Sequence, residues 1–231
     1  MVYFVGAGSG AVDLITVRGK NLLEQADVII YAGSLVNPEL LDYKKEGCMV
    51  YNSAKMTLED VLEVMEKAEA EGKMTVRLHT GDPCIYGAIR EQMDRLDEKG
   101  IDYESCPGVS AFCGAASALN LEYTLPGVSQ SAIITRMAGR TPVPERESIA
   151  SFAAHQATDG CFFEYRIAGR TFQGVDCRRL YGRDTGSDCI QGNLEGRRKI
   201  YLHGGNTGAD REGAQHYENG ADDHWRGSYP Q

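Results

Sequence analysis

The sequence has no excess of basic residues. Its 24 lysines and arginines are outnumbered by 33 aspartates and glutamates, which gives a formal net charge of -9. A surface this acidic repels polyanions, so we predict neither nucleic-acid binding nor binding to a membrane surface. An acidic substrate is compatible with this charge only where basic groups gather at one site.

Long hydrophobic runs and paired cysteines are also missing. No apolar segment approaches the ~20 residues that cross a bilayer, and Met1 leads into an apolar stretch without the basic region of a signal peptide. The seven cysteines are odd in number, and no two have a metal-ligand or CxxC spacing. We therefore expect a cytoplasmic protein with reduced thiols and no metal site, in which Cys84, Cys106 and Cys113 fill the core.

A regular alternation of strands and helices is present in the first 158 residues. The helix at Thr57 has the clearest signals, because Thr57 can cap it, Asp60 completes a capping box and Gly72 ends it. Such an alternation predicts an α/β fold with a parallel sheet. The predicted strands cover 2–8, 27–33, 74–83 and 101–108, and the predicted helices cover 16–26, 57–73, 89–100 and 109–120.

Three glycines follow the first predicted strand. Gly6, Gly8 and Gly10 have the spacing G-x-G-x-G, whereas the dinucleotide fingerprint is G-x-G-x-x-G. This spacing disfavours a nicotinamide or flavin loop. The remaining interpretation is a tight turn after a buried strand.

Two further motifs stand where strands end, which is where α/β sheets place their ligands. In "HTGDP", Gly81 lets a ligand approach the backbone, and Asp82 can accept hydrogen bonds from an amine or ribose hydroxyls. The alternative is a structural turn with Asp82 as the N-cap of a helix. In "CPGVSA", Ser110 and Ala111 open a helix whose first amides are free donors, or form a plain turn.

Arg136 and Arg140 lie close together in the stretch "TRMAGRTPVPE". Guanidinium groups suit carboxylates, so in an acidic chain this pair is a candidate anion site. The alternative is a solvated surface loop.

In this order, the motifs resemble the tetrapyrrole (corrin/porphyrin) methyltransferases over about residues 1 to 158. The resemblance implies two α/β domains with S-adenosylmethionine between them, and a homodimer. It is strongest to the branch that methylates C11 of precorrin-4 or cobalt-precorrin-4 in cobalamin biosynthesis, so a corrin-precursor tetrapyrrole is the implied substrate. A sibling methylase with another target carbon, or one acting on uroporphyrinogen, is the alternative. The motifs that carry the resemblance are "VGAGSGAVDLITVRG", "ADVIIYAGSLV", "RLHTGDPCIYGAI", "CPGVSAF", "ITRMAGRTPVPE" and "AAHQAT".

The resemblance also implies which residues bind. The family's first loop commonly reads G-x-G-P-G-D, and here Ser9 replaces the proline and Ala11 the aspartate. Arg136 and Arg140 become the candidate anchors for substrate carboxylates. A sulfonium methyl group is already activated, so transfer needs mainly positioning and desolvation, and we assign no general base. The implied cofactor contacts are Ser9, Asp82, Ile85, Ser110 and Ala111.

The last third of the chain has a different character. About half of the 27 glycines fall after Thr158, where no period of 2 or 3.6 is sustained. We divide the chain into an N-terminal α/β domain over 1–114, the start of a second α/β domain over 115–158, and a poorly structured tail over 159–231. A truncated second domain would leave an inactive fragment that binds S-adenosylmethionine weakly or not at all.

A shifted reading frame accounts for this tail. A shifted codon consists of the last two bases of one residue's codon and the first base of the next residue's codon. Read in this way, the tail can encode segments typical of the family's second domain. "DGCFFEY" permits M-V-V-F-L-S, "CIQGNLEG" permits V-Y-K-A-T-W-K, and "HYENGADDHWR" permits I-T-K-T-A-L-M-I-I-G. These matches fall in order and in one frame, so we hypothesise a single-base insertion near Thr158. The alternative is a genuinely disordered, glycine-rich tail.

Overall fold

The computed structural model describes residues 1–118, 120–127, 129–136, 138, 141–148, 151–152, 158–162, 189–194 and 197–202. Among these residues, no helix is both long and apolar enough to cross a membrane.

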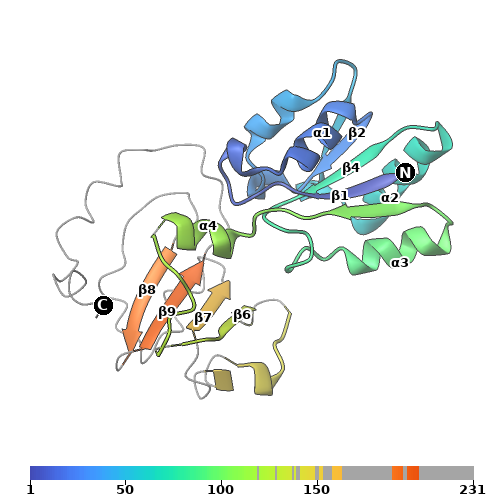
Figure 1. The fold of residues 1–231 in the computed structure, drawn as a ribbon. Coiled ribbons are helices and arrows are strands. Elements are labelled where there is room, and N and C mark those ends of the chain that lie inside the picture. The colour runs from blue at the N-terminus through green and yellow to red at the C-terminus, as the bar shows by residue number, and fades with distance from the viewer. Residues whose placement is uncertain are drawn as a thin grey trace.

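A five-stranded parallel sheet forms the first part of the molecule (Figure 1). Its strand order is β3-β2-β4-β1-β5, so β1 lies between β4 and β5. Val2 of β1 pairs with Thr75 on one side and with Tyr103 on the other. Because all five strands are parallel, their carboxyl ends share one edge. The strands are β1 (Val2–Gly6), β2 (Val28–Tyr31), β3 (Met49–Asn52), β4 (Thr75–His79) and β5 (Tyr103–Cys106).

Four α-helices connect and follow these strands, as the sequence predicts. The capping box of α2 is present: Thr57 Oγ1 accepts from the Asp60 amide at 3.1 Å, and Asp60 accepts from the Thr57 amide at 2.8 Å. Thr16 caps α1 in the same way, accepting from the Gly19 amide at 3.0 Å. The helices are α1 (Val17–Gln25), α2 (Leu58–Ala70), α3 (Arg90–Glu98) and α4 (Ala111–Ala118).

The first sheet buries apolar side chains on both faces. Helix α1 covers one face, where its Leu22 and Leu23 join Val5, Ile29 and other buried residues. Helices α2 and α3 cover the opposite face, with Met65 and Leu96 fully buried there. Burial on both faces explains why these strands read as continuous apolar runs instead of alternating with polar residues.

Strand β3 is one element that the sequence analysis did not predict. It pairs with β2 alone, at the edge of the sheet, and Met49 and Val50 stay 38% and 37% exposed. An edge strand buries little, so its sequence does not carry the apolar run that marks the inner strands. The first sheet otherwise confirms the predicted parallel α/β fold.

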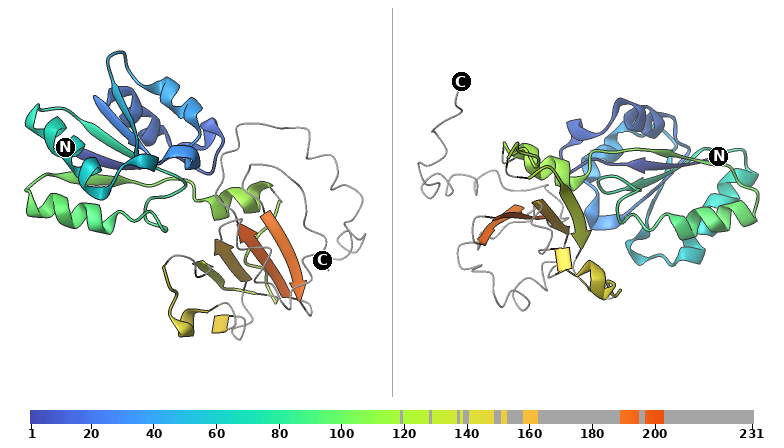
Figure 2. Two further views of the ribbon diagram at one scale, coloured as in Figure 1. Left: turned by 180° about the vertical axis from the view of Figure 1, so that it is seen from behind. Right: turned by 60° about the horizontal axis from the view of Figure 1, so that its bottom comes forward.

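A second sheet follows α4 and has the order β6-β7-β9-β8 (Figures 1 and 2). Strands β6, β7 and β9 are parallel, and β8 is antiparallel to β9. Helix α4 contacts β9. The strands are β6 (Ala132–Arg136), β7 (Thr158–Phe162), β8 (Cys189–Leu194) and β9 (Arg197–Leu202).

Three of these strands fall in or at the border of the tail that we predict to be poorly structured. Regular backbone is therefore present in part of that segment. The rest of it, over 163–188, 195–196 and 203–231, lies outside the described residues.

The cysteine prediction is right for one residue and wrong for two. Cys106 is buried at the end of β5, with 1% of its surface exposed. Cys84 and Cys113 are exposed, because the first lies in the loop after β4 and the second on the outer face of α4.

Candidate functional site

Three loops meet at the carboxyl edge of the first sheet. They follow β1, β4 and β5, which are adjacent strands, and cover residues 7–16, 80–89 and 107–110. The motifs "GAGSG", "TGDP" and "PGVS" stand in these loops, so the topology gathers what the sequence separates by about a hundred residues. This edge is where ligands bind in open α/β sheets.

Glycine is required where the three loops touch. A Cβ atom added to Gly108 would lie 2.1 Å from the Gly81 carbonyl oxygen and 2.7 Å from the Gly6 Cα. One added to Gly6 would lie 2.5 Å from the Gly108 Cα. Real Cβ atoms do not come this close to backbone, so side chains are excluded from the junction. We name these three residues, Gly6, Gly81 and Gly108, the glycine junction.

The first loop is a tight turn, as its glycine spacing indicates. The Gly8 amide donates to the Gly81 carbonyl at 3.2 Å, and the Gly81 amide donates to the Gly8 carbonyl at 2.9 Å. Gly8 has a φ of 82°, in the left-handed region that favours glycine. The turn after β1 is thus fastened to the loop after β4.

Asp82 ties the second loop to the third. Its Oδ1 accepts from the Cys84 amide at 2.7 Å, and its Oδ2 accepts from the Gly108 amide at 3.1 Å. The alternative of Asp82 as a helix N-cap is wrong, because α3 begins only at Arg90. The intervening residues form turns instead, with the Ile85 amide donating to the Asp82 carbonyl at 3.1 Å.

The remaining predicted cofactor contacts lie around the same edge. Ser110 and Ala111 are each 6% exposed and stand at the start of α4, where the Ser110 carbonyl accepts from the amides of Cys113 and Gly114. Ser9 in the first loop packs against α4, since a Cβ on Gly114 would lie 2.4 Å from the Ser9 Oγ. Ile85 is half-buried. All five residues therefore belong to the three loops or to the start of α4.

Two polar residues that the sequence analysis missed also hold this edge together. Asn37 is 8% exposed, and its side chain donates to the Gly10 carbonyl at 3.0 Å while accepting from the Glu39 amide at 3.0 Å. The Thr80 hydroxyl donates to the Leu35 carbonyl. Both connect the loop after β2 to the site. A signal for Asn37 existed in the Asn-Pro pair at 37–38, which marks a turn.

The segment after Asp82 has an unusual backbone. Tyr86 and Ala88 have φ values of 58° and 50°, a region that L-residues rarely adopt. Between them, a Cβ on Gly87 would lie 2.1 Å from the Pro83 carbonyl oxygen. Tyr86 is 53% exposed. Residues with such strained φ values cluster at ligand sites. This agrees with the position of the segment after Asp82, at the carboxyl edge of the first sheet.

Three titratable side chains near the site, those of His79, Cys84 and Cys113, are held neutral. Burial, with a smaller effect from the charge of Arg77, lowers the pKa of His79 from 6.5 to about 3. Burial raises the pKa of the Cys84 and Cys113 thiols, and the negative charge of Asp82 raises both further. His79 at the end of β4 is therefore an uncharged imidazole at neutral pH, and the two thiols are protonated.

The two predicted substrate anchors differ in what the structure shows. Arg136 ends β6, and its guanidinium donates to the carbonyls of Thr141 and Pro142 at 3.2 and 3.0 Å. Its own loop therefore orients it. Arg140 lies outside the described residues.

No metal site forms among the residues that the structure describes, where no three His, Cys, Asp or Glu side chains gather. What this edge offers is backbone amides and carbonyls, brought together by glycines and closed off on one side by α4. Such a surface can bind a polar organic molecule and exclude water from it.

The chain is similar to known proteins. Residues 1–167 match the family model of the tetrapyrrole (corrin/porphyrin) methylases. The cobalt-precorrin-4 C(11)-methyltransferase of Methanocaldococcus jannaschii is 56% identical over 161 residues, which cover 70% of this chain and 62% of that protein. The present chain thus spans less than two thirds of the length of this relative.

Two solved structures are similar to this one. The X-ray structure of a cobalt-precorrin-4 methyltransferase is 49% identical with a TM-score of 0.66, over 68% of this chain and 65% of that one. A uroporphyrin-III C-methyltransferase from Thermus thermophilus, complexed with S-adenyl homocysteine, is 28% identical with a TM-score of 0.51, over 63% of this chain and 59% of that one.

Proposed function

The chain belongs to the tetrapyrrole (corrin/porphyrin) methylase family, and from this premise we propose that it serves methyl transfer from S-adenosylmethionine to C11 of precorrin-4 or cobalt-precorrin-4. The observation that carries the proposal is the 56% identity to a cobalt-precorrin-4 C(11)-methyltransferase across the segment that builds the glycine-lined edge. The place of the reaction would be cobalamin biosynthesis.

The glycine junction fits S-adenosylmethionine. The cofactor carries a ribose, an amino acid and an adenine, and each of these binds well to backbone amides and carbonyls. The absence of side chains at Gly6 and Gly108 lets the backbones of the three loops pack against one another, and we propose that the edge held together in this way carries the cofactor. We propose that Ser9, Asp82, Ile85, Ser110 and Ala111 hold the cofactor. A similar protein is complexed with S-adenyl homocysteine, which supports S-adenosylmethionine as the cofactor.

Positioning is the catalytic contribution that we assign to this chain. When bound, the cofactor supplies a methyl group on a positively charged sulfur, which needs no further activation. The fastened loops after β1, β4 and β5 would fix its orientation, and α4 would keep water away. The Cys84 and Cys113 thiols are protonated, which is the less nucleophilic form of cysteine.

Arg136 and Arg140 are the proposed anchors for the substrate's carboxylates. Two carbonyls of the following loop already orient the guanidinium of Arg136. The Arg136 side chain would therefore lose less conformational entropy when a substrate carboxylate binds to it. A corrin precursor carries several carboxylates, so paired arginines suit it. Dimerisation, implied by the family resemblance, and a cytoplasmic location, expected from the cysteine usage, are part of the proposal.

We also propose the division of the chain at about residues 114 and 158, with residues 159–231 read out of frame. Two observations support it: the match to the family model ends at residue 167, and the glycine-rich composition begins at nearly the same place. Restoring the frame would replace nearly all of the sequence of β7 and all of that of β8 and β9. The nucleotide sequence across Thr158, together with the mass of the C-terminal peptides, decides this point. An intact frame that encodes the present tail contradicts it.

Product analysis tests the methyl transfer. The experiment compares the present chain with a frame-restored chain, in which the segment after Thr158 is translated in the shifted frame. Each is incubated with methyl-labelled S-adenosylmethionine and a panel of tetrapyrroles that includes uroporphyrinogen III and precorrin-4. We expect label at C11 of precorrin-4 from the frame-restored chain, and little or none from the present chain. Label at another carbon identifies a sibling methylase. No transfer by the frame-restored chain contradicts the proposed function.

A further inference from the structure

Arg77 is a buried cation without a counter-ion. It lies in the middle of β4, on the face covered by α2 and α3, and is 8% exposed. Its Nε donates to Gln92 Oε1 and its Nη1 donates to the Ile30 carbonyl, both at 3.2 Å. Both acceptors are neutral, and no carboxylate in the described part of the chain pairs with it. Burying an uncompensated charge is costly, so this position calls for an anion.

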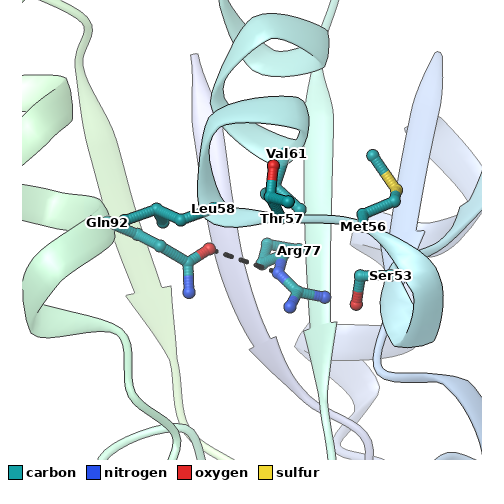
Figure 3. Close-up of a pocket in the computed structure, with 7 residues that line it drawn as sticks. All are labelled: Ser53, Met56, Thr57, Leu58, Val61, Arg77 and Gln92. Atoms are coloured by element: carbon teal, nitrogen blue, oxygen red, sulfur yellow. Dashed lines mark hydrogen bonds between the residues drawn. The ribbon is translucent and has the colours of Figure 1, made fainter.

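A cavity of about 120 Å³ lies beside this guanidinium (Figure 3). It has room for a few water molecules or one small anion. Figure 3 shows Arg77 between Gln92 and Ser53, next to the first turn of α2. The cavity is lined by Ser53, Met56, Thr57, Leu58, Val61, Arg77 and Gln92.

The polar groups around the cavity include both donors and acceptors, and some of the donors have no partner. Arg77 Nη2 donates to no described residue, which leaves it available to the cavity. The capping box uses the amides of Thr57 and Asp60, and the amides of Leu58 and Glu59 at the start of α2 have no partner within the helix. Two acids stand in the first turn of α2, Glu59 and Asp60, and the Asp60 carboxylate accepts from the Thr57 amide at 2.8 Å.

We propose that this cavity is a binding site for a small tetrahedral oxyanion, a phosphate or the terminal phosphoryl group of a phosphomonoester. A buried guanidinium and the first amides of a helix are the groups that bind such anions in proteins. The site is separate from the glycine junction, because Arg77 lies within β4 and faces α2 and α3, whereas the junction lies beyond the ends of the strands. It is independent of the proposed methyl transfer.

An NMR titration of the full chain with sodium phosphate tests this site. We expect the amide signals of Leu58 and Glu59 to shift and saturate, and sodium chloride at equal ionic strength to leave them in place. Glycerol phosphate is the second ligand. Saturation by both identifies a phosphoryl site open to esters, and saturation by inorganic phosphate alone identifies a site for the free anion.

Arg77→Met removes the charge and keeps an apolar side chain of similar length. We expect it to weaken phosphate binding at least about tenfold, the loss expected for a charge-assisted hydrogen bond. Arg90→Met, on the exposed side of α3, is the matched control and should bind as the unmodified chain does. Equal binding by Arg77→Met overturns the proposal. If Arg77→Met does not fold, the phosphate titration of the unmodified chain is the test. The absence of saturable shifts at Leu58 and Glu59 in that titration also overturns the proposal.

Discussion

At the scale of single residues, the side chains of this site act mostly on the protein itself. Asp82, predicted as a cofactor contact, accepts from two backbone amides of different loops. Asn37 and Thr80 likewise bind backbone carbonyls. The sequence indicates which residues stand at the ends of strands, but it does not show which loops they join. That information comes from the strand order, which places β5 next to β1.

Asp82→Ala should loosen the junction. The change removes both acceptors from the amides of Cys84 and Gly108, and we expect the free energy of unfolding to fall by about 1–3 kcal/mol, measured by urea denaturation. The control is Asp94→Ala, which breaks an exposed pair with Arg90 and should lower the free energy of unfolding much less than Asp82→Ala does. Equal losses in the two variants contradict the role of Asp82.

His79 should make stability depend on pH. Its pKa is about 3 in the folded chain against 6.5 for an exposed histidine. Below pH 6.5 the unfolded chain binds a proton that the folded chain does not, so stability falls as the pH falls, by up to ~1.4 kcal/mol per pH unit. Urea denaturation between pH 7.5 and 5 should show this loss, and His79→Gln should reduce it. The same slope in both proteins excludes His79 as the cause.

At the scale of elements, the sequence predicts the inner strands and the α-helices well. The capping box at Thr57 and Asp60 is present as predicted. The edge strand β3 was not predicted, since its exposed residues lack the pattern of a buried strand. The strained turn at Tyr86 and Ala88 was not predicted either, because no glycine occupies those two positions.

Thr57→Ala tests how much the N-cap of α2 stabilises the protein. Removing the hydroxyl leaves the Asp60 amide without its cap, and we expect a loss of about 1 kcal/mol in the free energy of unfolding. Ser117→Ala, at an exposed position inside α4, is the control and should change stability by less than about 0.5 kcal/mol. Chemical denaturation followed by circular dichroism measures both. A Thr57→Ala variant as stable as the control contradicts the cap.

At the scale of the whole molecule, the chain divides into a part that its sequence explains and a part that it does not. The parallel sheet, the glycine junction and the family all follow from residues 1–158. Strands β8 and β9 come from sequence with no strand periodicity. The structure describes the backbone pairing of these two strands. The proposed frameshift near Thr158 predicts other residues at their positions.

A crystal structure of the frame-restored chain with S-adenosylhomocysteine tests the central claim most directly. We predict that the ligand lies at the carboxyl edge of the first sheet, against the glycine junction, in contact with the loops after β1, β4 and β5 and with the start of α4. The claim is contradicted if S-adenosylhomocysteine binds at any other place, including the cavity beside Arg77.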